Sequence, residues 1–370
     1  MPTHEWLTAL MTMSVLLVGY GLAGRVFHAP LISAVPALDL RGIVTSNAER
    51  SVQAHQDHPN AEIYSSLDEA MTTSFDLVVI ATANVTHVPF AELALSAGAH
   101  VVVDKPVAAD ADQAQALADL AASRGLLAVP FQNRRWDSDF LTARRVVESG
   151  ALGFVHRFES RIDRMRVVPK QGWRGSPDPA DLGGMLYDLG SHLVDQSLAL
   201  MGPAVQVAAT VRSVRPLDPT DDDVTLLLTH ESGAISVLTA SQISAFPGPR
   251  MTVLGTHGGL RIDASDTQED ILRTGIVPSL DWGVEPETSA ATLRTFDDDN
   301  RATESRVPLE HGNWPNFYRC LAAAMSGESA APVSMTDAVA TLRVLDAARV
   351  SGATGTTVGL NPPAGHAPAN

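Results

Sequence analysis

The chain between residues 14 and 130 alternates between short apolar runs and stretches with helical periodicity. The apolar runs read SVLLV, LDLRGIV, FDLVVIAT, HVVVD and LLAVPF. Continuous runs rich in β-branched residues are typical of strands buried on both faces of a parallel sheet. The helix-like stretches between them span 25–35, 48–56, 86–96 and 110–123. This alternation predicts βαβ units and a doubly wound parallel (Rossmann) sheet, which binds ligands at the carboxyl ends of its strands.

After Phe131 the hydrophobic pattern changes. A helical stretch at 137–148 is followed by runs with looser alternation, FVHRFESRI, VQVAATVRSV, DVTLLLTH, GAISVLTASQI and MTVLGTHG. These predict a mostly antiparallel open sheet, accompanied by helices at 190–201, 316–325 and 335–350. The predicted organisation is a leader (1–12), a dinucleotide-binding domain (13–134), an α+β substrate and oligomerisation domain (135–351) and a flexible tail (352–370).

Composition narrows the class of protein. The 370 residues suit two domains, and the net charge of −16 argues against nucleic acid and anionic membranes as partners. The single cysteine, Cys320, excludes an intramolecular disulfide and a cysteine-based metal site. The histidines show no metal-ligand spacing, so we expect no metal. No apolar run reaches the ~20 residues that span a bilayer. We expect a cytoplasmic protein, with which the absence of disulfides is compatible.

A glycine motif lies between the first predicted strand and the first predicted helix. It runs Gly19-Tyr20-Gly21-Leu22-Ala23-Gly24. In this context Gly19 makes a tight turn, Gly21 lets the backbone approach a pyrophosphate, and Gly24 allows close packing of helix and strand. The helix N-terminus supplies an anion site. The alternative, a glycine-rich turn without a ligand, fits this context less well.

The second strand ends without an acidic residue. An Asp or Glu at this point usually binds the ribose 2′-hydroxyl of NAD. Here Thr45-Ser46-Asn47 follows, and small hydroxyl side chains leave room for a 2′-phosphate, which Arg50 could pair with. We therefore expect NADP as cofactor, with NAD possible. A solvated helix arginine is an equally good interpretation of Arg50.

Two further segments carry candidate chemistry. In VVVDKP, Lys105 ends a buried strand at the ligand edge of the sheet, although a snorkelling surface lysine is the alternative. In GGMLYDLGSHLVDQ, Asp188 and His192 are spaced i, i+4 and share one face if helical. A carboxylate beside an imidazole suits proton transfer, and a purely structural Asp–His hydrogen bond is the alternative.

Together these segments resemble the Gfo/Idh/MocA oxidoreductase family. The resemblance rests on GYGLAG, ATANVTH (81–87), DKP (104–106) and the segment with Asp188 and His192. The segments FHAPLI, QNRRWDSDFLT, Trp173-Arg174 and LYDLGSHLVDQ further resemble the family's NADP-dependent scyllo-inositol dehydrogenase branch. Two positions depart from the pattern, because Asp104 replaces the usual Glu and Asn47 stands where NADP-dependent members often have Arg.

The resemblance implies a hydride transfer between nicotinamide and a carbinol of a cyclic polyol or sugar, most closely that of a scyllo-inositol dehydrogenase. It implies Lys105, Asp188 and His192 as catalytic residues, with Asp188 orienting His192. The implied substrate residues are Lys105, Asn133, Arg164, Asp188 and His192. The implied cofactor-binding residues are Gly19, Tyr20, Gly21, Leu22, Ala23, Gly24, Thr45, Ser46, Arg50, Thr82, Asn84, His87, Asp104, Lys105, Pro106, Asn133, Trp173 and Arg174.

Other functions stay open at this point. One is another sugar or anhydrosugar reductase of the family, or an NAD-dependent glycosidase that recycles its cofactor. A non-catalytic nicotinamide-sensing regulator is a third hypothesis, which has no need of Lys105, Asp188 and His192 together. Apolar residues on both faces of VTLLLT and AISVLT also predict a homodimer or homotetramer assembled through the open sheet.

Overall fold

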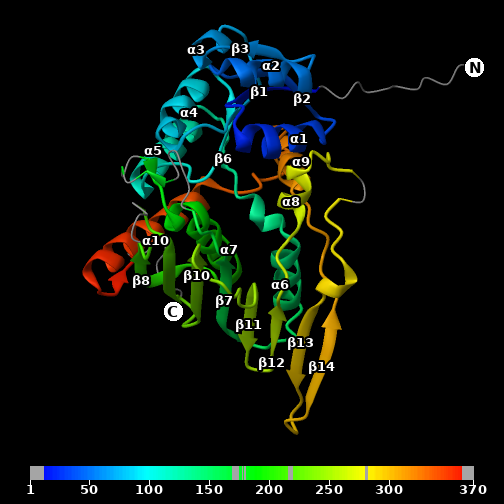
Figure 1. Ribbon diagram of the computed structural model, residues 1–370, viewed down its shortest axis with the longest axis vertical. Helices are drawn as coiled ribbons and strands as arrows, with labels where there is room; N and C mark the ends of the chain where they lie inside the picture. Colours follow the sequence, from blue (N-terminus) through cyan, green and yellow to red (C-terminus); the bar gives the residue numbers. More distant parts are fainter. Residues whose placement is uncertain are drawn as a thin grey trace, which may run out of the picture.

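The computed structural model describes residues 12–168, 175–176, 178, 181–215, 220–279 and 282–360, which form two sheets one above the other (Figure 1). The upper sheet has six strands in the order β3-β2-β1-β4-β5-β6, and all neighbours are parallel. The strands are β1 (Met13–Val18), β2 (Leu38–Val44), β3 (Glu62–Tyr64), β4 (Leu77–Ile80), β5 (His100–Val103) and β6 (Ala128–Pro130). The predicted Rossmann sheet is confirmed, and β3 escaped prediction because it has only three residues.

The upper sheet is buried on both faces, as continuous apolar strands require. Along β1, Leu16 and Val18 belong to one hydrophobic cluster, and Val15 and Leu17 to another on the opposite face. The flanking helices are a π-helix (Ala23–His28), α1 (Ala29–Ser33), α2 (Ala48–Asp57), α3 (Leu67–Ala70), α4 (His87–Ser96) and α5 (Ala111–Ser123). The strand order reverses between β1 and β4, and the carboxyl ends of these strands therefore border a crevice.

The lower sheet has nine strands in the order β14-β13-β12-β11-β7-β10-β9-β8-β15. Its neighbours are antiparallel except for β7 and β10, which are parallel, so the prediction of a mostly antiparallel sheet is confirmed. The strands are β7 (Val155–Asp163), β8 (Ala204–Arg212), β9 (Asp223–His230), β10 (Ile235–Ser241), β11 (Met251–Gly255), β12 (Gly258–Ile262), β13 (Ala291–Phe296), β14 (Ala302–Val307) and β15 (Val358–Gly359).

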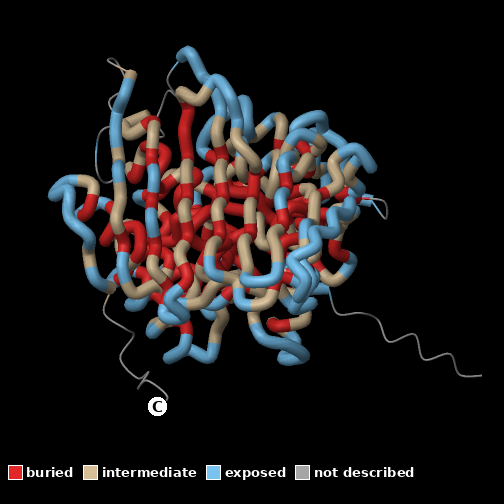
Figure 2. Tube along the Cα trace, turned by 90° about the horizontal axis from the view of Figure 1, so that it is seen from below, coloured by how far each residue is buried: buried red, intermediate tan, exposed pale blue. Residues whose placement is uncertain are grey.

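Helices cover one face of the lower sheet. They are α6 (Ser138–Glu148), a π-helix (Leu186–Gly190) that continues into α7 (Ser191–Met201), and α10 (Met335–Thr354). Along β9, Val224 and Leu226 are buried beneath this layer, whereas Thr225 and Leu227 face outward. Figure 2 shows the same alternation of buried and more exposed positions along several strands. The period-two pattern in the sequence arises from this half-buried geometry.

Two details of the packing bear on the predicted domain boundaries. Helix α9 (Pro315–Met325) packs on α1, and its Phe317 belongs to the hydrophobic cluster of Val15. One helix of the predicted second domain (135–351) thus packs with the layer of the upper sheet. The tail also begins later than residue 352, since α10 runs to Thr354 and β15 pairs with β8. The predicted leader, apart from residue 12, and the last ten residues lie outside the described part.

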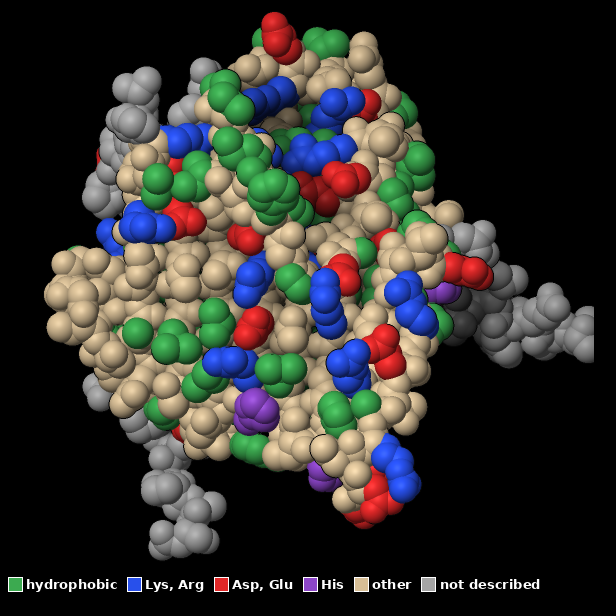
Figure 3. Space-filling view, turned by 60° about the horizontal axis from the view of Figure 1, so that its bottom comes forward, with side chains coloured by type: hydrophobic (Ala, Val, Ile, Leu, Met, Phe, Trp, Pro, Cys, Tyr) green, Lys and Arg blue, Asp and Glu red, His purple; other side chains and the backbone are tan. Residues whose placement is uncertain are grey.

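The other face of the lower sheet has a mixed character. Its outward positions on β7 include Arg157, Glu159 and Arg161, which make ion pairs with one another, while Leu227 on β9 is 42% exposed. Basic, acidic and hydrophobic side chains are also interspersed over the side of the molecule shown in Figure 3. The homodimer or homotetramer stays a prediction, which light scattering would test.

No helix within the described ranges is long and apolar enough to cross a membrane. The same ranges contain no cluster of three His, Cys, Asp or Glu side chains placed to hold a metal ion.

Candidate active site

Two cavities meet at Lys105. The first, here called the crevice, measures about 850 Å³ and follows the carboxyl ends of β1, β2 and β4. The second, here called the inner cavity, measures about 550 Å³ and lies between the two sheets. They share Leu22, Ala23, Asp104 and Lys105. A ligand that fills the crevice can therefore present one end to a second ligand in the inner cavity.

Most of the predicted residues line these two cavities. The crevice collects Gly19, Tyr20, Gly21, Leu22, Ala23, Thr45, Ser46, Arg50, Thr82, Asn84, His87, Asp104 and Lys105. The inner cavity collects Lys105, Asn133, Arg164, Asp188 and His192. Gly24 lines neither, and Pro106 lines a small recess beside Asn84 and Asp188. Trp173 and Arg174 lie outside the described residues.

The glycine loop has the close packing that a dinucleotide site requires. Gly19 has a φ of +99°, and a Cβ there would lie 2.5 Å from the carbonyl oxygen of Ala81. A Cβ on Gly24 would lie 1.9 Å from the Gly19 carbonyl oxygen. Gly21 differs, because a Cβ there would meet only Arg50 Nη1, at 3.7 Å. Gly19 and Gly24 thus serve the protein's own packing, and Gly21 leaves its backbone open to a ligand.

Polar groups along the crevice also suit a dinucleotide. Asn84 donates its Nδ2 to the carbonyl of Asp181, and its buried Oδ1 has no partner within the described structure. The side chain of Asn47 caps α2, where its Oδ1 accepts the backbone N–H of Arg50. This N-cap explains why a small polar residue stands here instead of arginine. The residues of the crevice therefore fit a nicotinamide dinucleotide.

Lys105 is held by the lower part of the molecule. Its Nζ donates to the backbone oxygen of Asp188 at 2.5 Å and to Asp188 Oδ1 at 3.0 Å. Its backbone N–H donates to Asp104 Oδ1 at 2.7 Å. The side chain thus points into the cavity where crevice and inner cavity join, and it is not the snorkelling surface lysine of the alternative interpretation.

The hydrogen-bond partner of His192 is Gln132, not the predicted Asp188. The Nδ1 of His192 donates to Gln132 Oε1 at 3.1 Å, since an amide oxygen can only accept. Asp188 lies in the π-helical turn, whose i→i+5 bonds alter how its side chain is aimed, and it binds Lys105 instead. Its charge still raises the pKa of His192. Gln132 follows β6 at the carboxyl edge of the sheet, and that position was the signal available in the sequence.

His192 is neutral under ordinary conditions. Burial lowers its pKa well below the usual value, and the charges of Lys105, Arg134 and Arg250 lower it further. Because Nδ1 keeps its proton and donates it in the hydrogen bond to Gln132, the lone pair of the neutral ring is on Nε2. The imidazole can therefore accept a proton from a group in the inner cavity.

Two family models match the chain. Residues 13–131 match an oxidoreductase family with an NAD-binding Rossmann fold, and residues 140–261 match the GFO/IDH/MocA C-terminal domain. The uncharacterized oxidoreductase YdgJ of Escherichia coli is 35% identical over 89% of this chain and 93% of its own length. This chain belongs to the Gfo/Idh/MocA oxidoreductase family. The expected family, Rossmann domain and oxidoreductase class are thereby confirmed, and its cofactor is a nicotinamide dinucleotide.

Other relatives in the family agree with this assignment. The NADP-dependent scyllo-inositol 2-dehydrogenase IolW of Bacillus subtilis is 32% identical over 92% of this chain and 94% of that protein. Among solved structures, the putative oxidoreductase yvaA of Bacillus subtilis has a TM-score of 0.90 at 30% identity, covering 95% of this chain and 99% of that one. A putative oxidoreductase from Klebsiella pneumoniae has a TM-score of 0.85 at 35% identity, covering 96% of both chains.

Buried side chains surround Asp104, which directly precedes Lys105. Burial alone would raise the pKa of Asp104, but His28, Lys105 and His87 together lower it, so this carboxylate stays ionised. His87 lies between the carbonyl oxygens of Pro106 and Thr82, at 2.8 and 3.3 Å. Both its ring nitrogens thus face the protein itself, which favours a positioning role over the predicted contact with cofactor.

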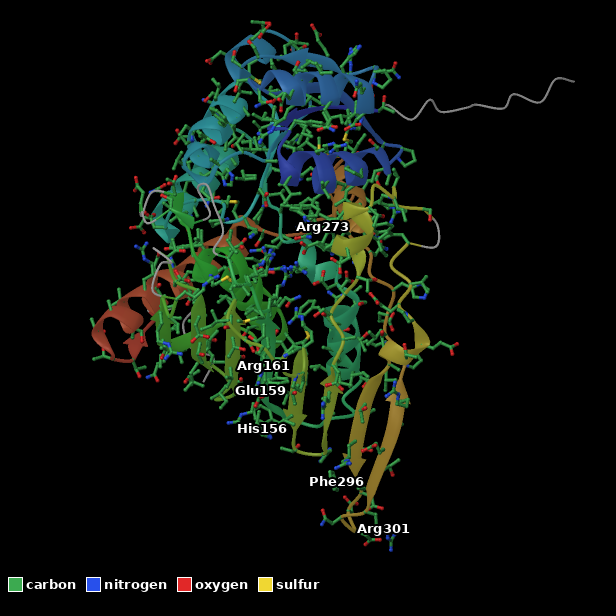
Figure 4. The ribbon with its side chains drawn as sticks, in the orientation of Figure 1. His156, Glu159, Arg161, Arg273, Phe296 and Arg301 are labelled. Atoms are coloured by element: carbon green, nitrogen blue, oxygen red, sulfur yellow. The ribbon has the colours of Figure 1, made fainter. Side chains whose placement is uncertain are left out.

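Several residues of the site have no recognisable signal in the sequence. Ser65 and Ser66 line the crevice but follow the three-residue β3, which has no periodic signal. Helix α8 (Gln268–Arg273) brings Glu269, Asp270 and Arg273 to the inner cavity, and Figure 4 shows Arg273 between the two sheets. Arg134, Arg166, Gln242 and Trp314 also line it. These residues come from loops and short helices, whose placement depends on tertiary packing.

The glycine geometry gives a test that separates cofactor binding from folding. We expect Gly21→Ala to weaken cofactor binding by about tenfold or more while the melting temperature stays unchanged, because the added methyl points into open crevice. Gly24→Ala is the matched comparison and should lower both, because its methyl collides with the Gly19 carbonyl. Fluorescence titration with NADPH and thermal unfolding measure the two effects. Equal loss of stability in both variants would contradict this account of the loop.

Proposed function

We propose that this protein transfers hydride between NADP and a secondary carbinol of a cyclic polyol or sugar. The main support for this proposal is that Lys105 and His192 line one cavity, which joins the crevice at Lys105. A proton acceptor and a cationic donor thus border the space next to the cofactor site. The printed name of the relative IolW, a scyllo-inositol 2-dehydrogenase, supports a polyol as the class of substrate.

His192 is the proposed base of this reaction. A nicotinamide dinucleotide bound in the crevice would supply the acceptor for the hydride of the carbinol carbon. Nε2 of His192 accepts the hydroxyl proton as the C–H bond breaks, and returns it in the reverse direction. Gln132 keeps the proton of the neutral ring on Nδ1, so the basic nitrogen is the one left for the substrate. The low pKa of His192 keeps it unprotonated before each oxidation.

Lys105 is the proposed electrophilic partner. Its Nζ has three protons, and two of them bond to Asp188. The third is left to donate to the carbinol oxygen and to stabilise its developing negative charge. Asp188 acts here as the residue that positions Lys105, and its charge offsets part of the repulsion between Lys105 and a protonated His192.

Removal of either proposed reacting group should abolish most of the activity. We expect Lys105→Met and His192→Asn each to lower kcat by roughly 10²–10³, the usual effect of losing one preorganised group. Cofactor affinity should change little, because the glycine loop is untouched. Reduction of NADP by a panel of inositols and aldoses measures kcat, and NADPH fluorescence measures binding. Near wild-type kcat in both variants would refute the site, and cofactor cycling without net reduction would indicate the glycosidase chemistry instead.

The contact between Gln132 and His192 predicts a shift in pH dependence. Oxidation needs neutral His192, so kcat/KM falls as the pH drops through its pKa, and the wild-type limb should lie below pH ~6.5. Gln132→Glu places a negative charge beside Nδ1, which stabilises the imidazolium and should move this limb to higher pH. Gln115→Glu on the exposed side of α5 is the control. An unmoved limb in Gln132→Glu would show that His192 does not set it.

Arg50 should decide the preference for NADP. Its guanidinium reaches over Gly21, and no carboxylate lies within ion-pair distance of it among the described residues. We expect Arg50→Gln to raise KM for NADP about tenfold or more and to leave KM for NAD nearly unchanged, because only NADP carries the 2′-phosphate. Arg41→Gln, an exposed arginine that lines neither cavity, is the matched control. A wild-type preference for NAD would refute the proposal.

A further inference from the structure

The inner cavity contains two arginines that the proposed chemistry does not use. Arg164 and Arg166 line this cavity and no part of the crevice. The cavity's other cations are paired, since Lys105 bonds to Asp188, Arg134 to Asp137 and Glu269, and Arg273 to Glu269. Among the described residues, no carboxylate lies within 4 Å of the guanidinium of Arg164 or Arg166. Their charges are therefore available to a ligand.

The backbone aims both side chains in the same direction. Strand β7 ends at Asp163, but the chain stays extended beyond it. The N–H of Arg164 donates to Ser241 O, and the N–H of Arg166 donates to Gln242 O, each at 2.8 Å. Met165 between them forms a bridge with Ile243. Residues i and i+2 of an extended chain lie on the same side, so the two guanidinium groups form a pair at the cavity wall.

Arg164 lines the same cavity as the proposed reacting groups and interacts with several of its charges. Although part of its side chain reaches solvent, burial lowers the pKa of Arg164, and the charges of Arg134 and Arg166 lower it further. Glu269 and Asp188 raise it. Arg164 thus lies within the field of Asp188, the residue that holds Lys105. Two neighbouring cations that repel each other are stabilised by an anion bound between them.

We propose that the substrate carries an anionic group, a carboxylate or a phosphate, which Arg164 and Arg166 bind while the reacting carbinol lies at Lys105 and His192. This inference rests on the proposed function and defines its substrate class as sugar acids or phosphorylated polyols. Guanidinium groups match the paired oxygens of both anions. The phosphates of the cofactor do not explain the pair, because they belong to the crevice, which shares neither arginine.

The net negative charge of the protein makes local cations necessary wherever an anion is to bind. At −16, the chain as a whole repels anions. Arg161 shows the contrast. It lies on β7 and pairs with Glu159 on the outer face, and Figure 4 labels both side chains in the lower sheet.

The test compares matched neutral and anionic substrates on the full-length protein. Rates of NADP reduction are measured with scyllo-inositol and D-glucose as neutral probes, D-glucuronate as a carboxylate and glucose 6-phosphate as a phosphate. We expect one of the anionic probes to exceed the neutral ones in kcat/KM. Arg164→Gln and Arg166→Gln should each lower the ratio of anionic to neutral kcat/KM roughly 10- to 100-fold, mainly through KM. Arg161→Gln, the matched control, should leave the ratio unchanged.

A binding measurement separates this inference from the proposed function. Calorimetric titration of the NADP-saturated protein with D-glucuronate and with glucose 6-phosphate should show binding that weakens with salt and in both cavity variants. If neutral probes are oxidised as well as the anionic ones and the variants keep the wild-type ratio, the inference is wrong and the proposed function stands. If an anion binds through both arginines but no probe reduces NADP, the anion site stands and the proposed function fails. If neither anion binds, the inference is wrong.

Discussion

The bond between Lys105 and Asp188 is the interaction on which the candidate site depends. Lys105 follows β5 of the upper sheet, and Asp188 lies in the π-helical turn above the lower sheet. One ammonium group therefore joins the two halves at the point where the crevice meets the inner cavity. Its two bonds to Asp188 fix the direction of Nζ. A lysine without such bonds would lose side-chain conformational entropy each time it bound the substrate, whereas the side chain of Lys105 is already ordered before binding.

The packing of the two halves protects that alignment. Helix α10 contacts α5 of the upper layer and β8 of the lower sheet, and α9 packs on α1. Trp314, at the start of α9, is buried and donates its Nε1 to Asp137 Oδ1 at 2.7 Å. Asp137 in turn pairs with Arg134, which lines the inner cavity. Buried ion pairs often contribute little net stability. Here the contacts of Asp137 connect the start of α9 to Arg134 in the wall of the inner cavity.

The sequence predicts those parts of the structure whose signals are local. Continuous apolar runs gave the strands of the upper sheet other than β3, and the glycine motif located the crevice because its spacing reflects backbone packing at Gly19 and Gly24. Lys105 could be singled out because it follows a continuous apolar run. The hydrogen-bond partner of His192 could not be predicted. The i, i+4 spacing suggested Asp188, and the sequence has no recognisable signal for a π-helical turn. Gln132 reaches the imidazole only when β6 and α7 are packed together.

The inner cavity was the least predictable part because chain segments far apart in sequence form it. Arg134 follows β6, Arg164 and Arg166 extend β7, and Arg273 ends α8. In the sequence each is an ordinary arginine, and an arginine in a strand is usually solvated. Only the folded structure distinguishes these arginines. It gives Arg134 and Arg273 a carboxylate partner in Glu269, whereas Arg164 and Arg166 line the same cavity as Lys105. The Rossmann domain that matches the family model lines the crevice, whereas the inner cavity lies between the two sheets. On the proposal made above, specificity for the substrate then depends on Arg164 and Arg166, which line the same cavity of about 550 Å³ as Lys105 and His192.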